Sequence, residues 1–177
     1  GEPEIIERGL KYIDDRLLET PSIALTQVKK EIARMGNMSL EVLRDSTNTF
    51  MNYSKETDKM AREKETVINE LARDTTRFLA MLSRTNLPSH EYDSITDLIS
   101  AINDFERIGD HAMNILELAE YREENNLPFS NIAIDELAEM SYKVEETVDL
   151  AISAFLHWDK EVSDKIAVNE EEIDNLE

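Results

Sequence analysis

The chain has 177 residues, of which 39 are acidic and 19 are basic, so its formal net charge at pH 7 is −20. A surface this acidic repels phosphate backbones, which argues against nucleic-acid binding, and it attracts cations instead. The sequence contains no cysteine, which excludes disulfides and thiolate metal sites, and no apolar run is long enough to span a membrane.

Only four glycines and four prolines interrupt the chain, which favours long helices. Residues 1–20 form a leader whose apolar side chains are Ile6, Leu10, Ile13, Leu17 and Leu18. A first helix is expected from Pro21 to about Tyr53, because Thr20 is a favourable N-cap and proline is favoured in a first turn. Its apolar residues recur at helical spacing: Leu25, Val28, Ile32 and Met35.

Two further helices are expected before residue 125. Ser54 is the predicted cap of the first of them, whose apolar stripe comprises Met60, Val67, Ile68, Leu71, Phe78, Leu79 and Leu82. The turn NLPSH at 86–90 follows, and Ser89 is the predicted cap of the next helix, which runs to about Glu124. Its stripe comprises Tyr92, Ile95, Leu98, Ile99, Ile102, Phe105, Ala112, Met113 and Leu116.

A fourth and a fifth helix are expected after the break NNLPFS at 125–130. The fourth begins after Ser130 and carries a heptad stripe of Ile134, Leu137, Ser141, Val144, Val148, Ala151 and Phe155. The fifth is capped by Asp159 and carries Val162, Ile166, Ile173 and Leu176. Because short turns join antiparallel neighbours, the fold is predicted to be all-α, with a three-helix bundle over 21–125 and two helices of another over 126–177.

The fourth helix's apolar stripe needs a partner, because this part of the chain supplies too few helices to close a second bundle. Such faces usually pack against another apolar surface. The stripe is therefore expected to pack against the first bundle or against a second copy of the chain, and a homodimer is predicted.

Paired polar residues four positions apart recur beside the apolar stripes. In INDFERIGDHAMNI, residues 102–115, Asp110 lies about 40° around the helix from Glu106, and the apolar arc lies at about 240–320°. Glu170 and Asp174 stand in the same relation to their stripe. Glu65 and Asn69 repeat the offset with an amide in place of the second acid, so three helices share one pattern.

Carboxylates four residues apart on a helix repel each other, and holding them near a partly desolvated seam costs more. A hard cation such as Mg, Ca, Mn or Fe would offset that cost through oxygen ligands. When the second and third helices pack, Glu65 and Asn69 could face Glu106 and Asp110 and form one oxygen-rich site. The alternative is ordinary surface ion pairing with Arg62, Arg73 or Arg107.

The remaining candidates for chemistry are weak. His111 points about 100° away from Asp110 and is expected to be exposed. No histidine follows a glutamate by three residues, as a ferritin-type di-iron site requires. The sequence also lacks a glycine-rich phosphate loop, G-x-S-x-G and H-E-x-x-H. With no nucleophile constellation, the chain is not predicted to be an enzyme.

DFERIGDHAMNI resembles the signature of PhoU-like proteins, the phosphate-uptake regulators. VNEEEIDNLE is similar to the family's other signature, and KETVINEL is its weaker counterpart in a first repeat. The leader GLKYIDDRLLETPSIAL, followed by VKKEIARM, resembles the segment that joins the membrane part of bacterial sodium/phosphate cotransporter-type proteins to a cytosolic PhoU-like domain.

The resemblance implies two tandem three-helix bundles, the second incomplete here, and metal clusters of Fe, Mn, Mg, Ca or Zn held by the acidic motifs. The implied ligands are Glu65, Asn69, Glu106, Asp110, Glu170 and Asp174. Asn69 stands where the family has an aspartate, which lowers the charge of the first site. The partner motif of the second pair is missing from these 177 residues, so that site is expected to be incomplete.

The resulting interpretation is a cytosolic regulatory domain of a membrane sodium/phosphate cotransporter-like protein. Its partners would be the transporter domain of the same full-length chain and a second copy, and phosphate would bind only through a bound metal. A structural oligomerisation module with vestigial acidic motifs is the main alternative. A metal-dependent hydrolase is compatible with two carboxylates and a cation, but the sequence offers it no base or nucleophile.

Overall fold

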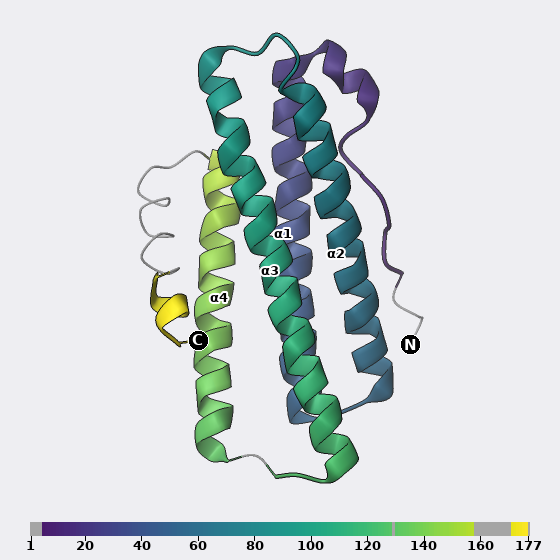
Figure 1. Ribbon diagram of the computed structural model, residues 1–177, viewed down its shortest axis with the longest axis vertical. Helices are drawn as coiled ribbons and strands as arrows, with labels where there is room; N and C mark the ends of the chain where they lie inside the picture. The colour runs from purple at the N-terminus through teal and green to yellow at the C-terminus, as the bar shows by residue number, and fades with distance from the viewer. Residues whose placement is uncertain (1–4, 129, 158–170, 177) are drawn as a thin grey trace.

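The computed structural model describes residues 5–128, 130–157 and 171–176. Across those ranges the chain consists of helices and connecting segments without a β-strand, which confirms the all-α prediction. The four long helices are α1 (Pro21–Met51), α2 (Lys55–Leu82), α3 (Ser89–Asn125) and α4 (Asn131–His157). In Figure 1 they run down, up, down and up, as the short connections between them require.

Local side-chain contacts explain where α2 and α4 begin. Ser54 Oγ accepts a hydrogen bond from the backbone N–H of Thr57 (3.4 Å), and Ser130 Oγ accepts one from Ala133 (3.2 Å). The predicted cap at Ser54 is therefore confirmed, and so is the predicted start of α4 after Ser130. The predicted cap at Ser89 is wrong, because α3 already begins at that residue and Pro88 occupies the N-cap position without a side-chain hydrogen bond. The predicted cap at Asp159 lies outside the described residues.

The apolar stripes of α1, α2 and α3 form the main core. Every stripe residue of α1, and every one of α2 except Met60, is buried: Leu25, Val28, Ile32, Met35, Val67, Ile68, Leu71, Phe78, Leu79 and Leu82. In α3, Tyr92 departs from the prediction, because 52% of its surface is exposed. It lies in the first turn, about 60° around the helix from the buried Ile95, at the edge of the packed face.

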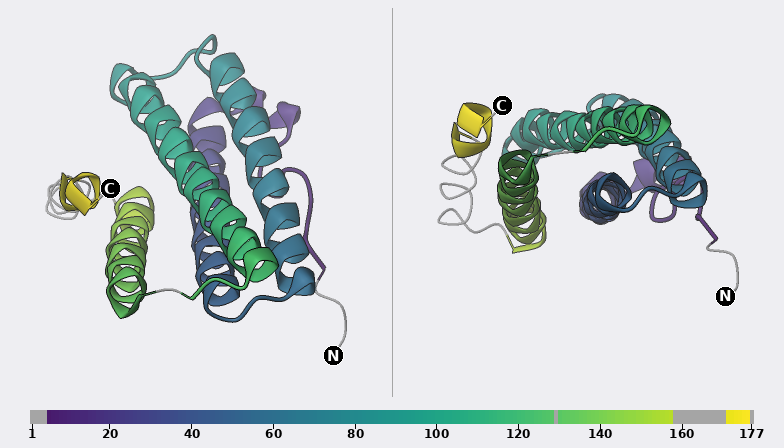
Figure 2. Two further views of the ribbon diagram at one scale, coloured as in Figure 1. Left: turned by 60° about the horizontal axis from the view of Figure 1, so that its bottom comes forward. Right: turned by 90° about the horizontal axis from the view of Figure 1, so that it is seen from below.

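Helix α4 packs mainly along α1 and also against α3 of the same chain (Figure 2). Its side chains Leu137, Met140 and Val144 contact a second buried cluster formed by Leu43, Phe50, Ile115 and Ala119. Val148 extends the main core, whereas the side chain of Phe155 lies outside the description. The expected partners of this stripe are the first bundle and a second copy of the chain. In the structure the stripe packs against the first bundle. The tandem-repeat division and the homodimer stay predictions.

At Gly36, side chains of α3 and α4 approach the backbone of α1 closely. A Cβ atom at this position would lie 2.9 Å from Phe105 Cζ and 3.2 Å from Ile152 Cδ1. Those distances are shorter than ordinary carbon contacts. Glycine is therefore required here by close packing, and it lets side chains of α3 and α4 meet over α1.

Residues 5–20 of the leader form a strap across α1 and α2 that includes the 3₁₀ helix η1 (Asp15–Glu19). The side chain of Glu31 in α1 is fully buried beneath it and accepts hydrogen bonds from the backbone N–H groups of Lys11 (3.0 Å) and Tyr12 (2.7 Å). Arg34 donates to Glu31 Oε1 (2.6 Å) and to the carbonyl of Gly9 (3.0 Å), whose φ of +81° suits glycine. A buried ion pair therefore fixes the strap to α1.

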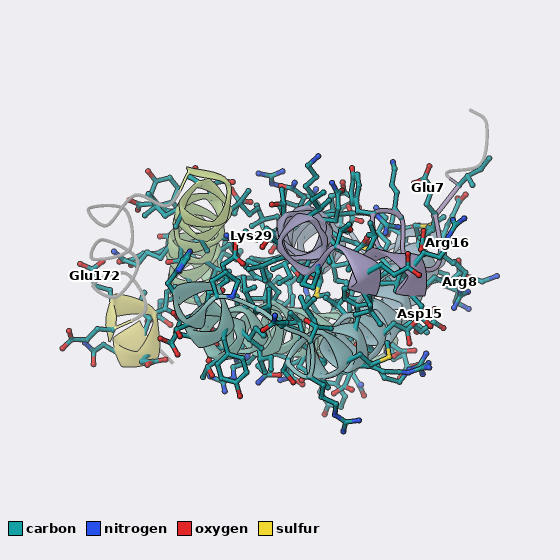
Figure 3. All side chains as sticks on the ribbon, turned by 90° about the horizontal axis from the view of Figure 1, so that it is seen from above. Glu7, Arg8, Asp15, Arg16, Lys29 and Glu172 are labelled. Atoms are coloured by element: carbon teal, nitrogen blue, oxygen red, sulfur yellow. The ribbon has the colours of Figure 1, made fainter. Side chains whose placement is uncertain are left out.

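The strap and the last described segment lie on opposite sides of the bundle. Figure 3 shows Glu7 and Arg8 at one side and Glu172, in the helical residues 171–176, at the other. The Glu172 carboxylate accepts a hydrogen bond from Lys143 Nζ of α4 (2.5 Å), which ties this short segment to the bundle. No described helix is both long enough and apolar enough to cross a membrane.

Candidate functional site

The predicted pairs of α2 and α3 meet at the groove between these helices. Gly109 of α3 is buried, and a Cβ atom there would lie 3.5 Å from Glu65 Cγ and 4.0 Å from Ile68 Cδ1 of α2. The Glu65 side chain therefore lies over Gly109, which stands between Glu106 and Asp110 in the sequence. These contact distances would also admit alanine, so close packing does not require glycine at Gly109 as it does at Gly36.

Asn69 brings an uncompensated oxygen to this groove. Its Nδ2 donates to Glu65 Oε1 (2.7 Å), which holds the amide and the carboxylate together on α2. Its Oδ1 is buried without a hydrogen-bond partner in the described part of the chain. Leaving a buried acceptor unpaired costs about 1–3 kcal/mol. An amide oxygen is also a ligand that hard cations accept, so a cation at Oδ1 would remove this cost.

The two carboxylates of α3 lie at the rim of the groove. Glu106 is half-buried and Asp110 is exposed, and neither forms an ion pair within the described ranges. Glu106 and Asp110 therefore do not form the surface ion pairs with arginine that the alternative interpretation expects. The arginines expected to neutralise them have other acidic neighbours: Arg62 pairs with Asp58 and Glu120, Arg73 pairs with Asp74, and Arg107 lies near Asp104.

The donor set suits a hard cation, because it combines carboxylate oxygens with the unpartnered amide oxygen of Asn69. Among the described residues, however, no three histidine, aspartate or glutamate side chains converge as a metal centre. Glu65 lies over Gly109, and Glu106 and Asp110 are neighbours of Gly109 along α3, but the three carboxylates do not surround one point. Metal binding by these residues thus stays a prediction, and Glu170 lies outside the described residues.

Asp174, the other member of that pair, does not join the groove between α2 and α3. It lines a cavity of about 160 Å³ beside α1, α3 and α4. The other residues around this cavity are Leu43, Asp104, Arg107, Ile108, His111, Met140, Val144, Thr147 and Ile173. Burial raises the pKa of Asp104, the Arg107 guanidinium lowers it, and the Asp174 carboxylate raises it again. The two predicted acidic motifs thus occupy different places.

The position of His111 corrects an expectation from the helical wheel. It was predicted to be exposed, but it is half-buried and lines this cavity. The reason is that α4 and residues 173–174 cover the side of α3 that carries His111. Sequence reasoning also missed Asp104 and Thr147, because neither belongs to a recurring pattern and only the packing of α4 brings them together.

The comparisons with known proteins cover the part of the chain that contains the groove. The family model for the PhoU domain matches residues 32–119, which include most of α1, all of α2 and most of α3. The matched segment contains Glu65, Asn69, Glu106 and Asp110, whereas α4 and Asp174 lie beyond it.

One relative covers more of the chain. The phosphate-specific transport system accessory protein PhoU homolog 1 of Thermotoga maritima is 25% identical over 154 residues, which are 86% of this chain. The chain spans 66% of that relative's length. No solved structure matches the chain. The PhoU-domain match and this relative together support the PhoU-like family for this chain.

Proposed function

We propose that this chain is a non-enzymatic regulatory domain of phosphate transport whose conformation depends on a cation held between α2 and α3. The observation that carries the proposal is the groove itself, which falls inside the PhoU-domain match. In it Glu65 lies over Gly109, and the oxygen of Asn69 is buried without a partner. The relative's name, an accessory protein of phosphate-specific transport, supports phosphate transport as the process.

The chain's own residues account for what such a cation could do. Glu65 and Asn69 would hold it from α2, and Glu106 and Asp110 would hold it from α3, so its loss would release the contact between the two helices. A bound cation would supply the positive charge that phosphate oxygens require. Without that charge the surface, with a net charge of −20, repels phosphate.

We further propose that the strap carries this conformation to a membrane transporter domain in the same full-length chain, with the bundle on the cytosolic side. The strap's sequence resembles the connecting segment of sodium/phosphate cotransporter-type proteins. The contacts of Glu31 and Arg34 support this route, because they join the strap rigidly to α1. Helix α1 in turn packs against α2 and α3.

Metal binding is the first test. Titration calorimetry with Mn²⁺, Mg²⁺, Ca²⁺ and Zn²⁺ should give saturable binding of at least one of these ions, and Glu106→Gln with Asp110→Asn should abolish it. Asn69→Asp should tighten it, because a carboxylate adds charge where the amide now stands. The matched control is Asp93→Asn with Asp97→Asn, an exposed pair four residues apart on the same helix. Unchanged binding in the Glu106/Asp110 variant would reject this site.

Phosphate flux is the second test. In cells whose phosphate uptake depends on the full-length protein, Glu106→Gln with Asp110→Asn should change uptake or its response to phosphate supply. The melting temperature of the metal-free domain should stay unchanged or rise, because two repelling carboxylates are removed. The Asp93/Asp97 variant should transport normally.

A purely structural oligomerisation module would behave differently. Phosphate uptake by the full-length protein would then not change in the Glu106/Asp110 variant. It would fail only in a variant that unfolds, such as Phe105→Ala. Normal uptake and normal regulation in the Glu106/Asp110 variant would therefore end the case for a metal-dependent regulator.

A further inference from the structure

The cavity beside α1, α3 and α4 is separate from the groove between α2 and α3. On the wheel of α3, Asp104 lies about 160° from Glu106, so the two sites use different faces of the helix. The cavity's volume of about 160 Å³ is close to the roughly 150 Å³ of an engineered protein cavity that binds benzene. There is room for one small organic molecule.

The wall of this cavity is mostly apolar. Leu43 of α1, Ile108 of α3 and Met140 and Val144 of α4 contribute to it, and Ile173 closes it from the short segment 171–176. Each of these side chains is aliphatic or a thioether. They favour the hydrocarbon part of a ligand, because removing such surfaces from water is favourable.

Three hydrogen-bond acceptors line the same cavity. Thr147 is only 8% exposed, and its hydroxyl donates to the carbonyl of Lys143 (2.9 Å), so towards a ligand its oxygen can only accept. Asp104 and Asp174 come from α3 and from the short segment, and neither has a hydrogen bond or an ion pair within the described residues.

The charges decide which ligand is favoured. Arg107 and His111 also line the cavity and would attract an anion, and Arg107, Asp104 and Asp174 are all exposed to solvent at its rim. Two carboxylates and the overall charge of −20 oppose an anion. A cation placed between Asp104 and Asp174 would relieve their mutual repulsion, so a cation fits these residues better.

We infer that the cavity binds a small primary alkylammonium ion, with the ammonium group between Asp104, Asp174 and Thr147 Oγ1 and the alkyl chain against Val144 and Met140. An ammonium group has three N–H donors, which match these three acceptors. Because Asp174 belongs to the segment 171–176, such a ligand would tie this segment to α3 and α4. The Lys143–Glu172 contact already holds the same segment to α4.

Calorimetric titration of the 177-residue chain with n-butylammonium chloride tests the inference. Saturable binding in the millimolar range or tighter is expected, with one ion per chain. Asp104→Asn should weaken it at least about ten-fold, because it removes a charge-assisted hydrogen bond. Thr147→Val should weaken it less, since a neutral acceptor is lost. Asp97→Asn is the matched control, because it removes one exposed carboxylate from the same helix, and it should leave the affinity unchanged.

Several outcomes would overturn the inference. These are butyrate binding as tightly as butylammonium, equal affinities in the Asp104→Asn and Asp97→Asn variants, or no saturation up to about 10 mM. N-acetyl-lysinamide binding as tightly as butylammonium would overturn the assignment to a free amine, because a protein lysine would then fit equally well. Thermal melting of each variant checks that it is folded. Glu106→Gln should not affect this binding, so failure here and failure of the proposed metal site are distinguishable.

Discussion

Replacing Glu31 with alanine is expected to lower the free energy of unfolding by about 3–5 kcal/mol, as removal of one partner from a buried ion pair usually does. The Glu31 carboxylate is fully buried and accepts hydrogen bonds from Arg34 and from two backbone N–H groups of the strap. Its loss would leave the Arg34 guanidinium without its partner and two N–H donors unsatisfied. Urea unfolding followed by circular dichroism measures the change.

The matched control is Glu70→Ala, which removes the contact between Glu70 and Arg8 (2.8 Å). This pair also joins the strap to the bundle, but it is largely exposed, so its loss should cost less than about 1 kcal/mol. Trypsin should cleave the strap near Lys11 faster in Glu31→Ala than in Glu70→Ala, because only the former frees the backbone. Equal stability losses in the two variants would contradict the assignment of Glu31 as the strap's anchor.

Phe105→Ala should cost about 3–5 kcal/mol, the usual range for deleting a buried aromatic ring. The ring is buried and lies against Gly36, where an added Cβ would approach it to 2.9 Å. Gly36→Ala alone should therefore destabilise the fold: overpacking costs about 1–3 kcal/mol, more than the roughly 1 kcal/mol gained in helix propensity. In the Phe105→Ala background the same methyl group should recover stability, because space is then available.

A double-mutant cycle on Gly36 and Phe105, measured by urea unfolding, gives the coupling directly. Gly109→Ala is the control, because its Cβ would meet Glu65 Cγ at an ordinary 3.5 Å. It should leave the stability unchanged or raise it by up to about 1 kcal/mol through helix propensity. Additive effects at Gly36 and Phe105 would show that the close approach over α1 does not limit the packing.

The local pattern of the sequence determined the helices and most of the core. Helical spacing of apolar residues identified the buried stripes of α1 and α2, and the serines at Ser54 and Ser130 marked two helix starts. The spacing of Glu106 and Asp110 also identified one side of the groove to which Glu65 is brought. These features follow from backbone geometry within a few turns, so a single sequence contains them.

The tertiary structure alone decided the rest. Nothing in the spacing of α4 indicates that it covers α1, that Asp174 meets Asp104 instead of Glu106, or that His111 becomes half-buried. The burial of Glu31 is likewise invisible in the sequence, because its partners lie about 20 positions earlier in a segment without periodic structure. Contacts of this kind depend on how completed helices pack, and many packings satisfy the same local pattern.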